Sequence, residues 1–113
     1  EAHYNLGVEL MKRGNTEEAR THYAAALRLN PEYGDAVMAM GFLEFQSGRM
    51  AQAIDYYSKS VRLNPRNAEA HNNLASALAL NGERGQAIQH YKTALEINPD
   101  FQGARDNLRK LTE

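Results

Sequence analysis

The sequence has no cysteine, no tryptophan and only three prolines among its 113 residues. Without cysteine, disulfide bonds and thiolate metal sites are excluded, and the redox compartment stays open. No apolar run approaches the roughly 18 residues that a membrane span requires, and no signal peptide is visible. The chain begins EAHYN, without methionine and already in a helical pattern. We therefore expect a piece of a longer protein, whose localisation stays unknown.

Neither sign of charge dominates the sequence. Thirteen lysines and arginines stand against 14 aspartates and glutamates, which gives a formal net charge of −1. Nucleic-acid backbones and anionic membrane surfaces attract proteins that carry an excess of positive charge. We therefore expect neither nucleic acid nor a membrane as a partner.

What the sequence does contain is a period of 34 residues. Asn-Pro pairs end at Pro31, Pro65 and Pro99, and the match extends well beyond them. Equivalent positions hold Gly14, Gly48 and Gly82, then Ala19, Ala53 and Ala87, then Tyr23, Tyr57 and Tyr91, and also Leu6, Met40, Leu74 and Leu108. A period of this length is typical of stacked helical repeats.

Each unit has the pattern of two helices. In the first unit Gly14 supplies the left-handed residue that ends a helix, and Asn30-Pro31 stops the next one. Small residues on the facing helices, such as Gly7, leave room for close packing beside a tyrosine. The sequence predicts a single all-α domain of seven helices: pairs over residues 1–33, 34–67 and 68–101, and a capping helix over 102–113.

These residues resemble the tetratricopeptide repeat (TPR) family. Its pattern is seen in repeat one as HYNLG…A…Y…A…NP and in repeat three as HNNLA…A…Y…A…NP. Repeat two is looser, with VMAMG at its start and Ser60 in place of alanine. The resemblance covers essentially the whole chain. It implies a right-handed α-solenoid whose concave face, lined by the first helix of each pair, holds a partner segment.

We expect Leu6, Met40 and their equivalents to be buried on the packing face of each first helix, so the groove side should lie off that face. In repeats one and two it is apolar, and in repeat three it is more polar. The candidates are Tyr4, Val8, Met11, Met38, Phe42 and Phe45, then Asn72, Ser76 and Ala79. Met and Phe adapt well to apolar peptide side chains. The alternatives are that this stripe is core, or that it meets another copy or a neighbouring repeat.

Asparagines recur just before the repeat position that holds Leu6, Met40, Leu74 and Leu108. Asn5, Asn73 and Asn107 are equivalent, and Ala39 interrupts the series. An amide both donates and accepts, so it can bind an extended peptide backbone. Similar ladders line family members that grip peptide backbones. The alternative is that these amides bridge neighbouring helices.

The resemblance also argues against one family activity. Chaperone-binding members grip an acidic C-terminus with a clamp of lysine, arginine and asparagine side chains. The matching positions here hold Tyr4, Val8, Ala39, Glu69 and Asn73. Only one amide remains, and Glu69 has the wrong sign, so we do not expect a carboxylate-clamp chaperone binder.

We expect no functional role for Glu44 or for the four histidines. Glu44 occupies a position where Leu10 and Leu78 stand, and we expect its side chain to reach solvent, with a partner's basic group as the alternative. The histidines, which we expect to be spread along the stack in structural or surface roles, are His3, His22, His71 and His90. No catalytic, phosphate-binding or metal motif occurs, so we expect no enzyme, cofactor or metal site.

The sequence thus predicts a non-catalytic module that binds a protein or peptide segment with apolar side chains. Val8, Met11, Met38, Phe42 and Phe45 would supply the apolar contacts, and Asn72, Asn73 and Asn107 would orient the backbone. One alternative is a self-assembling scaffold, which would form a homo-oligomer. Another is a substrate-selecting domain of a larger enzyme.

Overall fold

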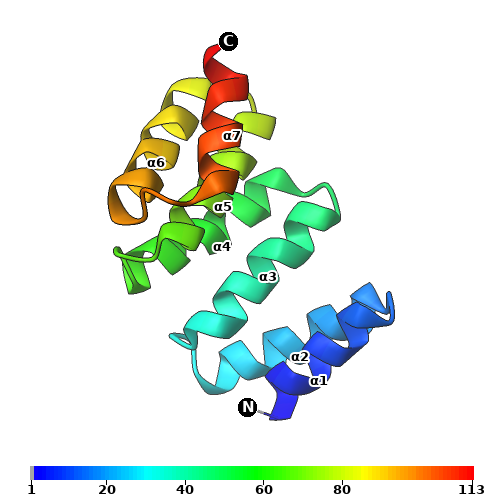
Figure 1. Cartoon of the computed structure of the whole chain (residues 1–113). Helices are drawn as coiled ribbons and strands as arrows, with labels where there is room; N and C mark the ends of the chain where they lie inside the picture. The colour runs from blue at the N-terminus through cyan, green and yellow to red at the C-terminus, as the bar shows by residue number, and fades with distance from the viewer. Residues whose placement is uncertain (1) are drawn as a thin grey trace.

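The computed structural model describes residues 2–113, which form seven α-helices (Figure 1). They are α1 (Ala2–Lys12), α2 (Thr16–Leu29), α3 (Gly34–Gln46), α4 (Met50–Leu63), α5 (Ala68–Leu80), α6 (Arg84–Ile97) and α7 (Gln102–Thr112). The pairs α1–α2, α3–α4 and α5–α6 pack together, and α2–α3, α4–α5 and α6–α7 join consecutive pairs. The all-α solenoid with three helix pairs and a capping helix is confirmed.

The turn inside each pair explains the periodic glycine. Gly14, Gly48 and Gly82 have φ values of 79°, 80° and 84°. In the first turn the Asn15 N–H donates to the Leu10 carbonyl at 2.8 Å, and the Gly14 N–H donates to the Met11 carbonyl at 3.0 Å. These two bonds close the end of the helix. They require Gly14 to adopt a left-handed conformation, which a residue with a Cβ atom would adopt only with strain.

The turn between pairs explains the periodic Asn-Pro. The Asn30 carbonyl accepts from the Tyr33 N–H at 3.1 Å, and its side-chain Oδ1 accepts from the Glu32 N–H at 3.2 Å. The same two bonds recur at Asn98, at 3.1 and 3.2 Å. Proline fits the second position of such a turn because its ring fixes φ, and the asparagine side chain supplies the extra acceptor.

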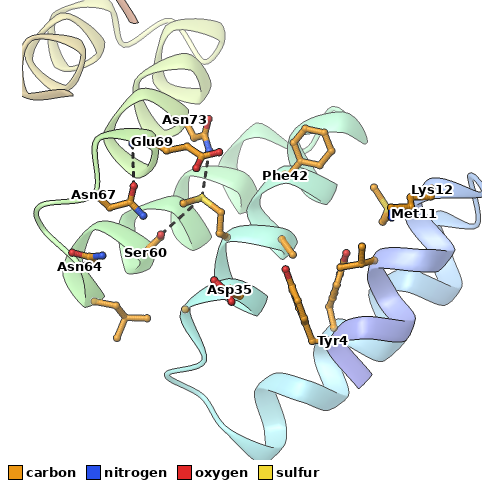
Figure 2. A pocket seen from close by; sticks show the side chains of 16 residues that line it. Tyr4, Met11, Lys12, Asp35, Phe42, Ser60, Asn64, Asn67, Glu69 and Asn73 are labelled. Atoms are coloured by element: carbon orange, nitrogen blue, oxygen red, sulfur yellow. Dashed lines mark hydrogen bonds between the residues drawn. The ribbon is translucent and has the colours of Figure 1, made fainter. Parts of the chain in front are cut away.

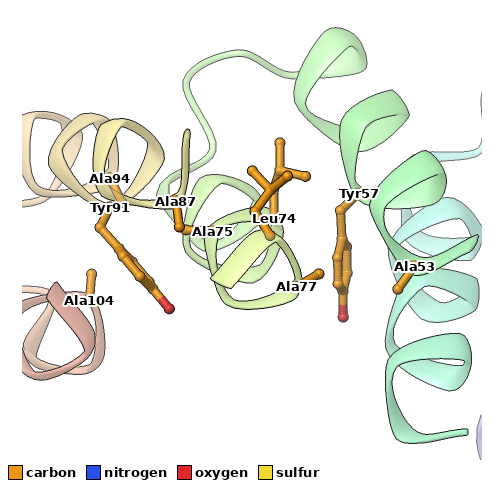
Figure 3. Packing of buried hydrophobic residues seen from close by; sticks show 10 residues of the cluster. Ala53, Tyr57, Leu74, Ala75, Ala77, Ala87, Tyr91, Ala94 and Ala104 are labelled. Atoms are coloured by element: carbon orange, nitrogen blue, oxygen red, sulfur yellow. The ribbon is translucent and has the colours of Figure 1, made fainter. Parts of the chain in front are cut away.

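Close helix packing within the pairs explains the small residues. A Cβ at Gly7 would lie 2.5 Å from the Tyr23 ring, and one at Gly41 would lie 2.6 Å from the Tyr57 ring. In the largest core cluster, Tyr57 lies near Ala53, and both are buried (Figure 3). Each tyrosine therefore fills the space that its facing glycine leaves open, as the sequence predicted.

The expectation that Leu6 is buried on the packing face is wrong. Leu6 is 44% exposed, whereas its equivalents Met40 and Leu74 are each 4% exposed. Met40 is buried because it packs in one cluster with Ala19 and Tyr23 of the preceding helix pair. Leu6 has no comparable cluster of neighbours among the described residues.

The expectation that Glu44 reaches solvent is also wrong. Glu44 is 4% exposed, and its carboxylate accepts two bonds from Arg20 of α2, at 3.0 Å from Nη2 and 3.3 Å from Nε. Arg20 stands at a repeat position that holds isoleucine in the other two repeats, as Ile54 and Ile88. An apolar contact between consecutive repeats has become a buried ion pair inside the chain.

The histidines do not spread along the stack as expected. His3 and His22 place their Nδ1 atoms 3.1 Å apart, and so do His71 and His90. The reason is that each pair occupies facing positions on the two helices of one repeat. One histidine pair therefore joins α1 to α2 in the first repeat, and the other joins α5 to α6 in the third.

Candidate functional site

A hollow of about 500 Å³ lies beside the first helices of the three pairs (Figure 2). Most of its lining comes from α1, α3 and α5, and Tyr23 of α2, the last turn of α4 and the loop to α5 complete it. The lining includes Tyr4, Val8, Met11, Lys12, Asp35, Met38, Phe42, Ser60, Asn64, Asn67, Glu69 and Asn73. We call this cavity the principal hollow.

Two further hollows adjoin it. One of about 540 Å³ is lined by Asn72, Asn73 and Phe101 among others, and one of about 210 Å³ is lined by Phe42, Phe45 and Ser76 among others. Asn73 borders all three cavities, so they lie next to one another. We refer to the three together as the inner groove.

Apolar side chains dominate one part of the inner groove. Phe42 is 48% exposed although it is a large aromatic residue, and it borders two of the cavities. Tyr4, Val8 and Met38 are half-buried along the same wall. Phe45 lies deeper, because it also packs against the largest core cluster. The predicted residues Tyr4, Val8, Met11, Met38, Phe42 and Phe45 thus all line the groove.

The predicted asparagines divide into two groups. Asn72 and Asn73 line the groove, whereas Asn5 and Asn107 are absent from the lining of these cavities. The Asn73 amide donates to the Met38 sulfur at 3.3 Å, and the Asn107 amide donates to Asn72 Oδ1 at 3.4 Å. These contacts bridge neighbouring helices, which is the alternative that the sequence left open. They use one polar atom of each groove asparagine.

Two carboxylates that were not among the predicted groove contacts border the principal hollow, although the sequence had already placed Glu69 at a clamp position. Asp35 and Glu69 occupy equivalent repeat positions in the first turns of α3 and α5. Asn67 fixes the start of α5, because its side chain accepts from the Glu69 and Ala70 N–H groups at 3.0 and 3.3 Å. The spacing of 34 residues between Asp35 and Glu69 was the signal that could have identified the two carboxylates as a pair.

Two phenols in and beneath the groove have raised pKa values, chiefly because they are buried. Burial, and secondarily the charge of Asp35, raises the pKa of the Tyr4 phenol. Burial, and secondarily Glu69, raises the pKa of Tyr57 to about 12. Both phenols therefore stay protonated at neutral pH.

Other kinds of site have little support among residues 2–113. No cluster of three or more His, Asp or Glu side chains there is arranged to hold a metal ion. No helix in the described part of the chain combines the length and apolar character needed to cross a membrane. The groove is therefore the feature on which a function can be argued.

Comparisons with known proteins agree with the helical-repeat fold. A tetratricopeptide repeat model matches residues 4–66 and again residues 43–101. No curated protein sequence matches the chain. Among solved structures, the first TPR of Spaghetti (RPAP3) bound to the HSP90 peptide SRMEEVD superposes with a TM-score of 0.94 at 22% identity, over 98% of this chain and 88% of that one.

Two other solved structures are longer than this chain. The O-GlcNAc transferase of Thermobaculum terrenum (K341M mutant) has a TM-score of 0.88 at 24% identity, over 97% of this chain and 21% of the enzyme. The protein MamA has a TM-score of 0.92 at 24% identity, over 97% of this chain and 60% of MamA. The chain thus spans about a fifth of the transferase and three-fifths of MamA, and these similarities concern the fold.

Proposed function

The chain belongs to the tetratricopeptide repeat family, and from that premise we propose that it binds a peptide or helical segment of another protein in the inner groove. Members of this family are generally protein–protein interaction modules. Apolar anchors of the partner would contact Phe42 and its neighbours, and asparagines would contact the partner's backbone. No catalytic step is part of this proposal.

The observation that carries the proposal is the exposure of Phe42 inside a concave surface. A phenylalanine that is 48% exposed leaves apolar area in contact with water, and a partner that covers it recovers the cost. Met11 and Met38 border the same cavity. Their flexible, polarizable side chains adapt to apolar groups of different shapes.

The asparagines support the backbone part of the proposal. The Asn73 amide is engaged with the Met38 sulfur, and the Asn72 oxygen is engaged by Asn107. This leaves the Asn73 oxygen to accept a bond and the Asn72 amide to donate one. Such a donor and acceptor, adjacent in the groove, match the alternating groups of an extended peptide.

The partner should differ from the peptide seen in the Spaghetti structure. That peptide, SRMEEVD, carries three acidic residues. Asp35 and Glu69 border the principal hollow here, and like charges oppose binding. We therefore expect SRMEEVD to bind this chain weakly or not at all, as the clamp argument from the sequence also predicts.

Selection from a random 12-residue peptide library displayed on phage tests the proposal. Selected peptides would be synthesised, and their affinities for the protein and its variants measured by fluorescence anisotropy. Phe42→Ser should weaken binding by about 10-fold or more, since burying an aromatic side chain contributes about 1.5–3 kcal/mol. Circular dichroism would establish that the variant remains folded.

Leu29→Ser is the matched control for this variant. Leu29 is 76% exposed, so the substitution removes a similar apolar side chain from contact with water. Leu29 does not line the groove. It should leave peptide affinity unchanged. If Phe42→Ser is folded and binds every selected peptide as tightly as the unmodified protein does, the groove is not the binding site.

The exposure of Leu6 favours self-assembly as a second candidate. Its equivalents are buried by the preceding helix pair, and a second copy that stacks on α1 would bury Leu6 in the same way. Light scattering across protein concentrations should then show a dimer or larger species, which Leu6→Lys abolishes. A monomer at all concentrations would contradict this candidate and leave the peptide proposal intact.

A further inference from the structure

We infer that the segment bound in the inner groove carries a basic side chain beside its apolar anchor, and that Asp35 and Glu69 receive it. The inference rests on the proposed function and specifies the chemistry of the partner. The observation behind it is the charge of the groove, which combines an exposed aromatic residue with carboxylates that lack a cation.

The two carboxylates are positioned alike but belong to different repeats. Each lies in the first turn of a groove-lining helix, and both border the principal hollow. Among the residues that the structure describes, neither forms an ion pair with a lysine or arginine. The buried carboxylate of Glu44, in contrast, is matched by Arg20 at 3.0 Å.

Their position in the helices explains how they remain stable without a cation. The N-terminal turn of a helix presents partial positive charge, which favours a carboxylate there. Asn67 strengthens this at α5, since its side chain caps the helix at the Glu69 N–H. The carboxylates are therefore stable in water, where no partner is bound.

Binding changes that balance. A peptide that covers Phe42 and Met38 displaces water from the neighbouring carboxylates, and an unpaired charge loses hydration at a cost. A lysine or arginine on the peptide offsets this loss, whereas a neutral or acidic residue does not. The groove therefore selects for a cation next to the apolar anchor.

The single basic residue that lines the principal hollow indicates on which side of the anchor the partner's basic residue should lie. Lys12 is the only lysine or arginine in the lining, and it comes from the last turn of α1. In the view of Figure 2 it lies near Met11, on the other side of Phe42 from Asp35 and Glu69. The partner's basic residue should therefore lie on the side of its apolar anchor that faces the starts of α3 and α5, away from Lys12.

The test uses the library-selected 12-residue peptides that lose affinity with Phe42→Ser. These peptides should contain lysine or arginine near an apolar residue, and replacing that residue with glutamine should weaken binding. The double variant Asp35→Asn/Glu69→Gln should weaken binding by about 5- to 25-fold, the range expected when a partly desolvated cation loses its carboxylate contacts. Raising NaCl from 0.05 to 0.5 M should reduce affinity for the unmodified protein more than for the variant, as screening predicts.

The matched control is Asp55→Asn/Glu96→Gln, which changes net charge equally but alters exposed carboxylates outside the groove lining. It should leave affinity unchanged. If Phe42-dependent peptides lack basic residues, or bind the groove double variant and the unmodified protein equally, the inference is wrong while the proposed function stands. If no selected peptide depends on Phe42, the proposed function itself fails.

Discussion

A single methyl group added at Gly41 should destabilise the protein. Gly41 lies in α3 where the helix passes closest to Tyr57 of α4, and a Cβ there would be 2.6 Å from two atoms of the ring. Ordinary carbon contacts are about 3.5–4.0 Å, so the ring or the helix must move by about 1 Å. Tyr57 is 2% exposed and packs in the largest core cluster, which leaves it little room.

Two opposing effects set the magnitude. Overpacking a core typically costs about 1–3 kcal/mol, and replacing glycine by alanine inside a helix contributes up to about 1 kcal/mol of stability. The buried position of Tyr57 places the cost toward the upper end of its range. We therefore expect Gly41→Ala to lower the free energy of unfolding by about 1–2 kcal/mol.

Urea denaturation followed by circular dichroism at 222 nm measures this change. Gly85→Ala is the control, because Gly85 lies in α6 with nothing within 4 Å of the added Cβ. It should be neutral or raise stability by up to about 1 kcal/mol. A Gly41→Ala variant at least as stable as the unmodified protein would refute the argument that Tyr57 requires glycine opposite it.

Two further predictions concern buried polar pairs. Glu44→Ala should lower the free energy of unfolding by about 3 kcal/mol, because it deprives the mostly buried Arg20 of its main acceptor. The double variant R20I/E44L copies the apolar pair at the equivalent positions, so it should recover most of the lost stability. Urea titrations measure both changes. Burial, and secondarily His71, lowers the pKa of His90, so the unfolded state binds more protons. The associated stability is fully present above the unfolded-state pKa of about 6.5 and is lost as pH falls from there through the lower folded-state pKa. Melting temperatures between pH 5 and 8 should show this decline, and H71V/H90Y, which copies the second repeat, should reduce it; an unchanged pH profile in that variant would contradict the assignment.

The fold was predictable because the repeat supplies its own evidence. Three glycines at one repeat position indicated a left-handed turn residue, and the structure gives all three φ values near 80°. Three Asn-Pro pairs indicated helix ends, and the same hydrogen-bonded turn is present at Asn30 and Asn98. Local rules of turn chemistry decide these features, so a sequence is sufficient to read them.

Features that depend on contacts between repeats were harder to predict. The burial of Leu6 depends on which helix lies against it, and no property of the residue itself reveals that neighbour. Glu44 and Arg20 each depart from an apolar repeat position, and considering the two departures together would have predicted their pairing. The shared spacing of 19 residues between His3 and His22 and between His71 and His90 was a similar signal.

Departures from the repeat therefore fall into two physical classes. Arg20 and Glu44 depart together and satisfy each other at 3.0 Å, so they replace one internal contact by another. Phe42 departs alone: the equivalent residues are Val8 and Ser76, and no change elsewhere in the described chain covers the larger ring, which stays 48% exposed. A departure that is compensated inside the fold requires no partner, whereas one that leaves apolar area in water at a concave surface costs stability that internal packing does not return. That distinction, more than the apolar character of the stripe, is the physical reason to place the binding contact at Phe42.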